Sequence, residues 1–161
     1  MIPIVVTAAP PLFVLFGREF QCTSNRYRQT KVAYVVDTFE QSTAYAVIES
    51  LLRGSADALA AIDHPRGCLS VQGGLACSPQ NAGVSEVLAA GRAATECVLE
   101  QRLARAVQDG DLPAGVGTRA LARFVMVLNE GFTVHAAAGV ERDDLHASID
   151  TALRSVMALC S

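Results

Sequence analysis

Residues 118–138, TRALARFVMVLNEGFTVHAAA, decide which fold this chain can adopt. Apolar side chains recur there three or four positions apart, the period of an α-helix with one buried face. More apolar side chains, such as Val127 and Val134, lie beyond that face. Gly139 supplies a typical helix C-cap. The stretch therefore predicts a long helix that is apolar on more than one side. The residues expected on its main stripe are Leu121, Phe124, Val125, Leu128, Phe132 and His135.

A second helix follows over residues 142–159, after only a few connecting residues. Its apolar stripe consists of Leu145, Ile149, Leu153 and Val156. Two helices joined so closely pack antiparallel. Because the pair is apolar on more than one side, it needs a second partner, and the simplest partner is the same pair from another copy. The sequence therefore predicts a homodimer held by a four-helix bundle.

Helical patterns also cover most of the preceding chain. Apolar spacing predicts helices over the stretch 27–41, from Thr43 to Ala61 and from Asn81 to Gly110. The intervening GCLSVQGGLACSP fits a buried strand or a short helix, but a lone strand would have no partner, so we expect a short helix ending before Pro79. The predicted fold class is all-α, an orthogonal helical bundle whose C-terminal antiparallel helix pair forms a dimeric four-helix bundle.

Composition and charge narrow the function classes. The chain has 161 residues, which suits one domain, and 51% of them are hydrophobic. A net charge of -3 provides no broad cationic surface for nucleic acid, so DNA binding by this chain alone is not expected. The five scattered cysteines form no C-x-x-C pair and indicate a reducing cytoplasm.

The first sixteen residues, MIPIVVTAAPPLFVLF, carry no charge. They lack the cationic start of a signal peptide, and three prolines interrupt any helix. They are also shorter than the ~20 apolar residues of a membrane span. We therefore expect neither secretion nor a membrane partner.

Motifs for catalysis are absent from the sequence, since no P-loop, G-x-S-x-G, H-E-x-x-H or dinucleotide fingerprint occurs. His146 lies near Asp143 and Asp150 at helix spacing, but one histidine among surface carboxylates is typical of a solvated helix rather than of a metal site. We expect no enzymatic activity, no metal and no cofactor.

Polar residues inside otherwise apolar helix faces can orient a small molecule in a helical bundle. The candidates are Tyr34, Gln72, Asn129 and His135, and Gly73 and Gly74 would leave room beside Gln72. Ordinary packing or surface exposure is the competing interpretation for each of them.

Several motifs occur in a specific order along the chain: Arg66-Gly67-Cys68-Leu69, Gly110-Asp111-Leu112-Pro113, the helix start Ala122 to Phe124 and the small-residue ending Ala136 to Gly139. In this order and spacing, residues 27–159 resemble the C-terminal effector-binding and dimerisation domain of tetracycline-repressor-like (TetR family) transcription regulators, which are mostly repressors.

The resemblance implies roles for particular residues. It places Leu121, Phe124, Leu128, Phe132, Leu145, Ile149, Leu153 and Val156 in or beside the dimer bundle, where the apolar pattern adds Val125. It places Tyr34, Ile48, Leu52, Gln72, Leu75 and Leu128 near a pocket for a small, mainly apolar effector, where Asn129 and His135 are polar candidates.

The beginning of the chain departs from the family pattern. Family members carry a basic helix-turn-helix head that reads operator DNA, whereas this chain begins with an apolar segment. We therefore expect an atypical segment over residues 1–25 in place of the head, followed by the sensing domain over residues 26–161. Operator DNA would then be bound only through a helix-turn-helix that is not present here.

Two other functions stay open at this point. A small helical carrier or enzyme would use Tyr34, Gln72 or His135 in a pocket, and loss of turnover in His135→Ala would favour it. A module that only dimerises would show no ligand-induced thermal shift.

Overall fold

The computed structural model describes residues 37–61, 66–76, 78 and 81–160. The helices there are α3 (Ala44–Ala60), α4 (Leu69–Ala76), α5 (Ala82–Gln108), α6 (Thr118–Ala137) and α7 (Arg142–Cys160). The expected all-α fold is confirmed, and these helices match the predicted segments closely. The helix expected over 27–41 and the atypical segment 1–25 lie largely or wholly outside the described residues.

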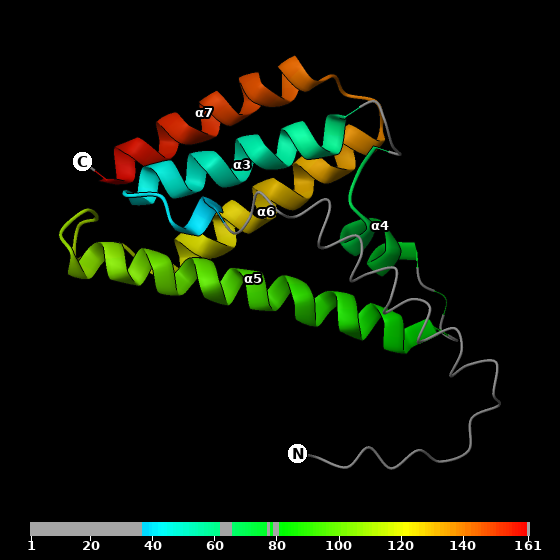
Figure 1. Ribbon diagram of the computed structural model, residues 1–161, viewed down its shortest axis with the longest axis horizontal. Coiled ribbons are helices and arrows are strands. Elements are labelled where there is room, and N and C mark those ends of the chain that lie inside the picture. Colours follow the sequence, from blue (N-terminus) through cyan, green and yellow to red (C-terminus); the bar gives the residue numbers. More distant parts are fainter. Residues whose placement is uncertain (1–36, 62–65, 77, 79–80, 161) are drawn as a thin grey trace, which may run out of the picture. The chain divides into compact units, whose positions relative to one another are not determined.

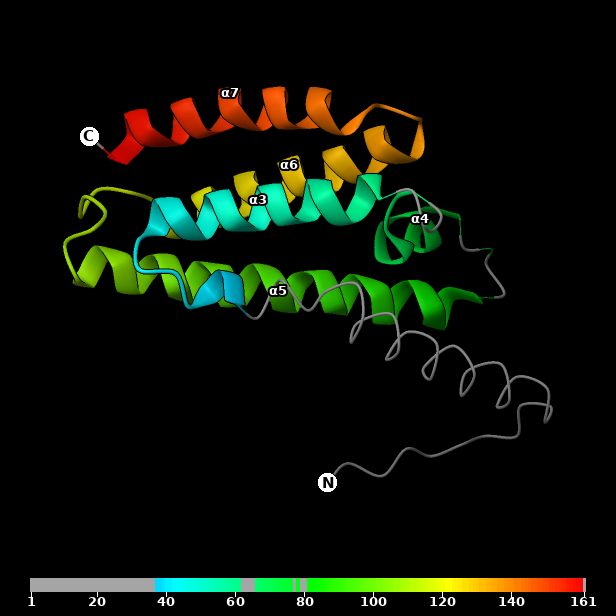
Figure 2. The ribbon, with the colours of Figure 1, turned by 45° about the horizontal axis from the view of Figure 1, so that its top comes forward.

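Helix α3 is the element around which the core is built. It packs against both α7 and α6, while α5 packs against α6 and the short α4 (Figures 1 and 2). Its inner face is a continuous aliphatic stripe in which Val47, Ile48 and Leu52 have no exposed surface. Burying such side chains stabilises the fold by roughly 1.5–3 kcal/mol each.

Helices α6 and α7 run in opposite directions, as expected from their short connection (Figure 1). They nevertheless contact each other little, because both rest on α3. A stripe of apolar residues at helical spacing predicts that this face of the helix is buried, but it does not identify the element that covers the face. Here the stripes of α6 and α7 meet a helix of their own chain.

The Gly110-Asp111-Leu112-Pro113 motif joins α5 to α3. Gly110 has φ +79°, the left-handed conformation that ends α5, and the amides of Gly110 and Asp111 bond to the carbonyls of Val107 and Ala106 at 3.2 and 2.8 Å. An Asp111 carboxylate oxygen accepts a hydrogen bond from the backbone amide of Ala44 at 2.6 Å. This aspartate therefore caps a helix that begins 67 residues earlier.

Asp111→Ala should lower the free energy of unfolding by about 1–2 kcal/mol, because it removes a charge-assisted cap from the first turn of α3. The cap made by Thr43, whose hydroxyl accepts from the amide of Ala46 at 3.1 Å, would remain. Urea unfolding measures the difference. The exposed neighbour Asp109 is the matched control, and Asp109→Ala should change stability by less than about 0.5 kcal/mol. Equal losses in both variants would contradict the cap.

Candidate functional site

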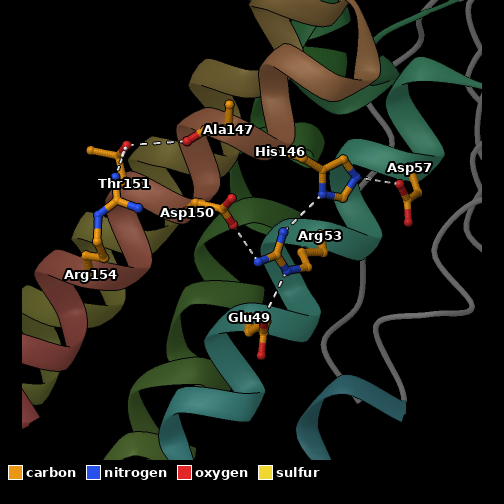
Figure 3. Close-up of polar contacts among 8 residues, drawn as sticks. All are labelled: Glu49, Arg53, Asp57, His146, Ala147, Asp150, Thr151 and Arg154. Atoms are coloured by element: carbon orange, nitrogen blue, oxygen red, sulfur yellow. Dashed lines mark hydrogen bonds and ion pairs between the residues drawn. The ribbon is translucent and has the colours of Figure 1, made fainter.

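A network of charged side chains links α3 to α7 (Figure 3). On α3, Glu49, Arg53 and Asp57 follow one another at four-residue spacing and so share one face. The Arg53 guanidinium donates to Glu49 Oε1 at 2.9 Å and to Asp150 Oδ1 at 2.6 Å. The two helices are therefore joined by a cation held between carboxylates.

His146 of α7 lies between two members of this network. Its Nδ1 is 3.2 Å from Arg53 Nη1, and its Nε2 is 2.8 Å from Asp57 Oδ1. Arginine can only donate hydrogen bonds, so Nδ1 accepts and Nε2 carries the hydrogen that points at Asp57. The histidine is thus committed to protein partners. Within the described residues no group of three His, Cys, Asp or Glu side chains is placed to hold a metal ion.

Hydrogen bonds in the network favour the charged forms of Asp57 and Arg53. Partial burial raises the pKa of Asp57, but hydrogen bonds from Arg142 and His146 outweigh burial, and the net pKa lies below the ordinary 3.8. Hydrogen bonds to Asp150 and Glu49 raise the pKa of Arg53. These bonds join side chains of α3 to side chains of α7 and so help fix how the two helices lie on each other.

Acid should weaken this contact. A depressed carboxyl pKa contributes stability that is present above the unfolded-state pKa and is lost as pH falls through the folded-state pKa. The Asp57 contribution should therefore disappear below about pH 4. Since Asp57 is 46% exposed, we expect less than about 1 kcal/mol. Melting temperatures from pH 7 to pH 3 should fall less steeply for Asp57→Asn than for the wild type, with exposed Asp143→Asn as control. Parallel curves would contradict the assignment.

A groove of ≈ 250 Å³ lies between α5 and α6. Two ion pairs cross between these helices, Arg123 with Glu96 at 2.8 Å and Arg92 with Glu130 at 3.5 Å. The complete lining is Arg92, Ala93, Glu96, Arg123, Met126, Val127 and Glu130.

Arg92 also fastens α4 to this pair of helices. Its Nη1 donates to the carbonyl of Ser70 at 2.6 Å. A Cβ atom at Gly74 would lie 3.1 Å from that nitrogen, so the glycine leaves the space the guanidinium occupies. Sequence reasoning missed Arg92, and the paired glycines of α4 were the one local signal of a close approach.

The predicted pocket residues that the structure describes differ in their exposure. Ile48 and Leu52 are fully buried in the core, whereas Leu128 is half-buried. Gln72 and His135 are exposed. Tyr34 and the side chain of Leu75 lie outside the described residues. Asn129 is partly buried, and its Oδ1 atom has almost no solvent contact.

Most of the predicted dimer residues lie in the core of a single chain. The buried ones are Leu121, Val125, Phe132, Leu145, Ile149, Leu153 and Val156, each at most 8% exposed. Leu128 is half-buried, and Phe124 is 41% exposed. Large apolar side chains also stay exposed at Val127 (60%) and Val134 (49%), so part of the outer face of α6 is apolar.

No helix among the described residues is both long enough and apolar enough to cross a membrane.

The fold is similar to that of solved transcription regulators. A cysteine-substituted form of the TetR family transcriptional regulator CifR, complexed with 26-base-pair operator DNA, is 30% identical at a TM-score of 0.81, over 91% of this chain and 79% of that one. A further CifR variant on operator DNA is 29% identical at a TM-score of 0.80, with the same coverage. A protein from Rhodococcus sp. RHA1 described as a TetR transcriptional regulator is 33% identical at a TM-score of 0.69, over 92% of this chain and 81% of that one. No protein-family model and no curated protein matches the sequence.

Proposed function

This chain belongs to the TetR family of transcriptional regulators, and we propose that helices α3–α7 form its effector-sensing and dimerisation domain. The observation that carries the proposal is agreement in fold and sequence over about four-fifths of a known regulator's length (79%). The role is regulation by binding, most simply repression, with no catalytic step and no cofactor. We place the protein in the cytoplasm, where operator DNA would be reached.

Dimerisation would use the outer face of α6. On α6, Val127 and Val134 follow Phe124 by three and ten residues, so all three side chains lie on one side of the helix. Exposed apolar side chains gathered in this way mark an interaction surface, and a second copy is the simplest partner for it. The buried stripes of α6 and α7 would support this face from behind by fixing both helices on α3.

Effector binding would use the interior between α3, α4, α5 and α6. Ile48 and Leu52 supply apolar surface from α3, and Leu128 and Asn129 belong to α6. The ligand would be small and mainly apolar. It would act by preferring one of two arrangements of the protein, and it can shift their balance only by its difference in affinity.

Operator contact would come from outside these helices. Five arginines of the described residues pair with carboxylates, so their charges are neutralised locally. These arginines are Arg53, Arg66, Arg92, Arg123 and Arg142. In the intact regulator, the domain would transmit effector occupancy to the part that binds DNA.

Native mass spectrometry of the purified chain tests the proposal, because it reports subunit number and retained small molecules together. A dimer with added mass, or a dimer whose melting temperature rises with an apolar ligand, would support it. A monomer would overturn the α6 interface. A dimer that shows neither retained mass nor a ligand-induced thermal shift would indicate a module that only dimerises.

A further inference from the structure

Asn129 carries a buried hydrogen-bond acceptor that the described part of the chain leaves unpaired. Its Oδ1 has almost no solvent contact and accepts no hydrogen bond from residues 37–61, 66–76, 78 or 81–160. Buried carbonyl oxygens are nearly always paired, since leaving one unpaired forfeits its hydration without replacement. The fold is therefore less stable with this asparagine than it would be with an apolar side chain of the same shape.

Helix spacing places Asn129 on the inward side of α6. Met126 and Thr133, three residues before it and four after it, are 6% and 2% exposed, and Ala122 and Ala136 on the same face are fully buried. The Thr133 hydroxyl donates to the backbone oxygen of Asn129 at 3.1 Å. That bond occupies its single proton, so Thr133 donates nothing to the side-chain oxygen of Asn129.

The fully buried polar side chains of the described residues are uncharged. Among the described residues, the buried polar side chains are Thr38, Ser55 and Thr133, all hydroxyls. A charged ligand would lose its hydration among these side chains, which makes its burial costly. A neutral ligand meets no such obstacle.

We propose that Asn129 selects the chemical class of the effector: an uncharged, mainly apolar molecule with a hydroxyl or N–H group that donates to Oδ1. The inference rests on the proposed function, because it assigns a ligand to that sensing domain.

Two probes of nearly equal shape test the class. Both p-cresol and 4-methylanisole are neutral and apolar, but the first carries a hydroxyl donor that methylation removes from the second. Titration calorimetry should give a dissociation constant about fivefold to tenfold lower for p-cresol with the wild type, the size of one net hydrogen bond. Asn129→Leu, which keeps the shape and removes the acceptor, should bind both probes equally. Thr133→Val is the matched control and should keep the wild-type preference.

The melting temperature of the unliganded chain provides a second measurement. Asn129→Leu should raise the melting temperature of the unliganded chain by about 2–4 °C, because it removes an unpaired acceptor. A lower melting temperature would show that the carboxamide has a structural partner, and it would overturn the inference while leaving the sensing domain intact.

Equal wild-type affinity for both probes would likewise overturn the role of Asn129 and leave the proposed function standing. Failure of both probes to bind, together with no retained mass in native mass spectrometry, would remove both proposals.

Discussion

Phe124→Glu should convert the proposed dimer into a monomer at micromolar concentration. Phe124 is 41% exposed on the outer face of α6, so the substitution leaves the core of the chain untouched. In a symmetric dimer both copies carry the substitution, so two unpaired charges enter the interface. At about 2 kcal/mol for each copy, the dissociation constant rises about 1000-fold. Sedimentation over a concentration series measures it.

The matched control is Val98→Glu. Val98 is 45% exposed, almost as much as Phe124, but it lies on α5. This variant should dimerise like the wild type. If Val98→Glu dissociates while Phe124→Glu stays dimeric, the interface lies on α5 and not on α6.

Leu52→Ala should lower the free energy of unfolding by about 2–5 kcal/mol, because removing a buried leucine loses apolar burial and leaves a cavity. Leu52 has no exposed surface and lies in the core cluster that α3 shares with α5, α6 and α7. Such a loss is a large part of the roughly 5–15 kcal/mol that holds a typical domain folded. Urea unfolding with an unchanged slope measures it.

The size of this loss also separates a packed core from an open pocket. Leu52→Met conserves volume and should cost less than about 1.5 kcal/mol. Val87→Ala, at a side chain that is 51% exposed, should change stability by less than about 0.5 kcal/mol. If Leu52→Ala costs no more than Val87→Ala, Leu52 faces an open cavity already in the unliganded chain, and its assignment to a closed core before effector binding is wrong.

Much of the fold was predictable because helical period and turn chemistry are local. The expected helices agree with α3–α7 within a few residues, and Gly110 and Gly139 end α5 and α6 with positive φ as expected. The helical period of the sequence could not reveal which element packs against each apolar stripe. Val125 and Ile149 carry the pattern of a buried face, and that pattern is the same whether the covering helix belongs to this chain or to another copy.

The candidate site was less predictable, since helix α6 is apolar on two faces. His135 lies eleven residues after Phe124, close to three helical turns, so it falls on the exposed outer face although its spacing in the sequence also extends the inner stripe. Arg92 bonds to a carbonyl on another helix, and Asp111 caps one far away in sequence. Contacts of this kind depend on the packing of helices, which local spacing does not specify.

The Asp111 cap has a consequence for the order in which the chain folds. The carboxylate that completes the first turn of α3 is separated from Ala44 by 67 residues, so a growing polypeptide has made all of α4 and α5 before that bond can form. Closing so long a loop is entropically costly and follows local helix formation. Helix α3 therefore reaches its final stability late, because its cap waits for the connector after α5 and the helices it packs against most, α6 and α7, come later still.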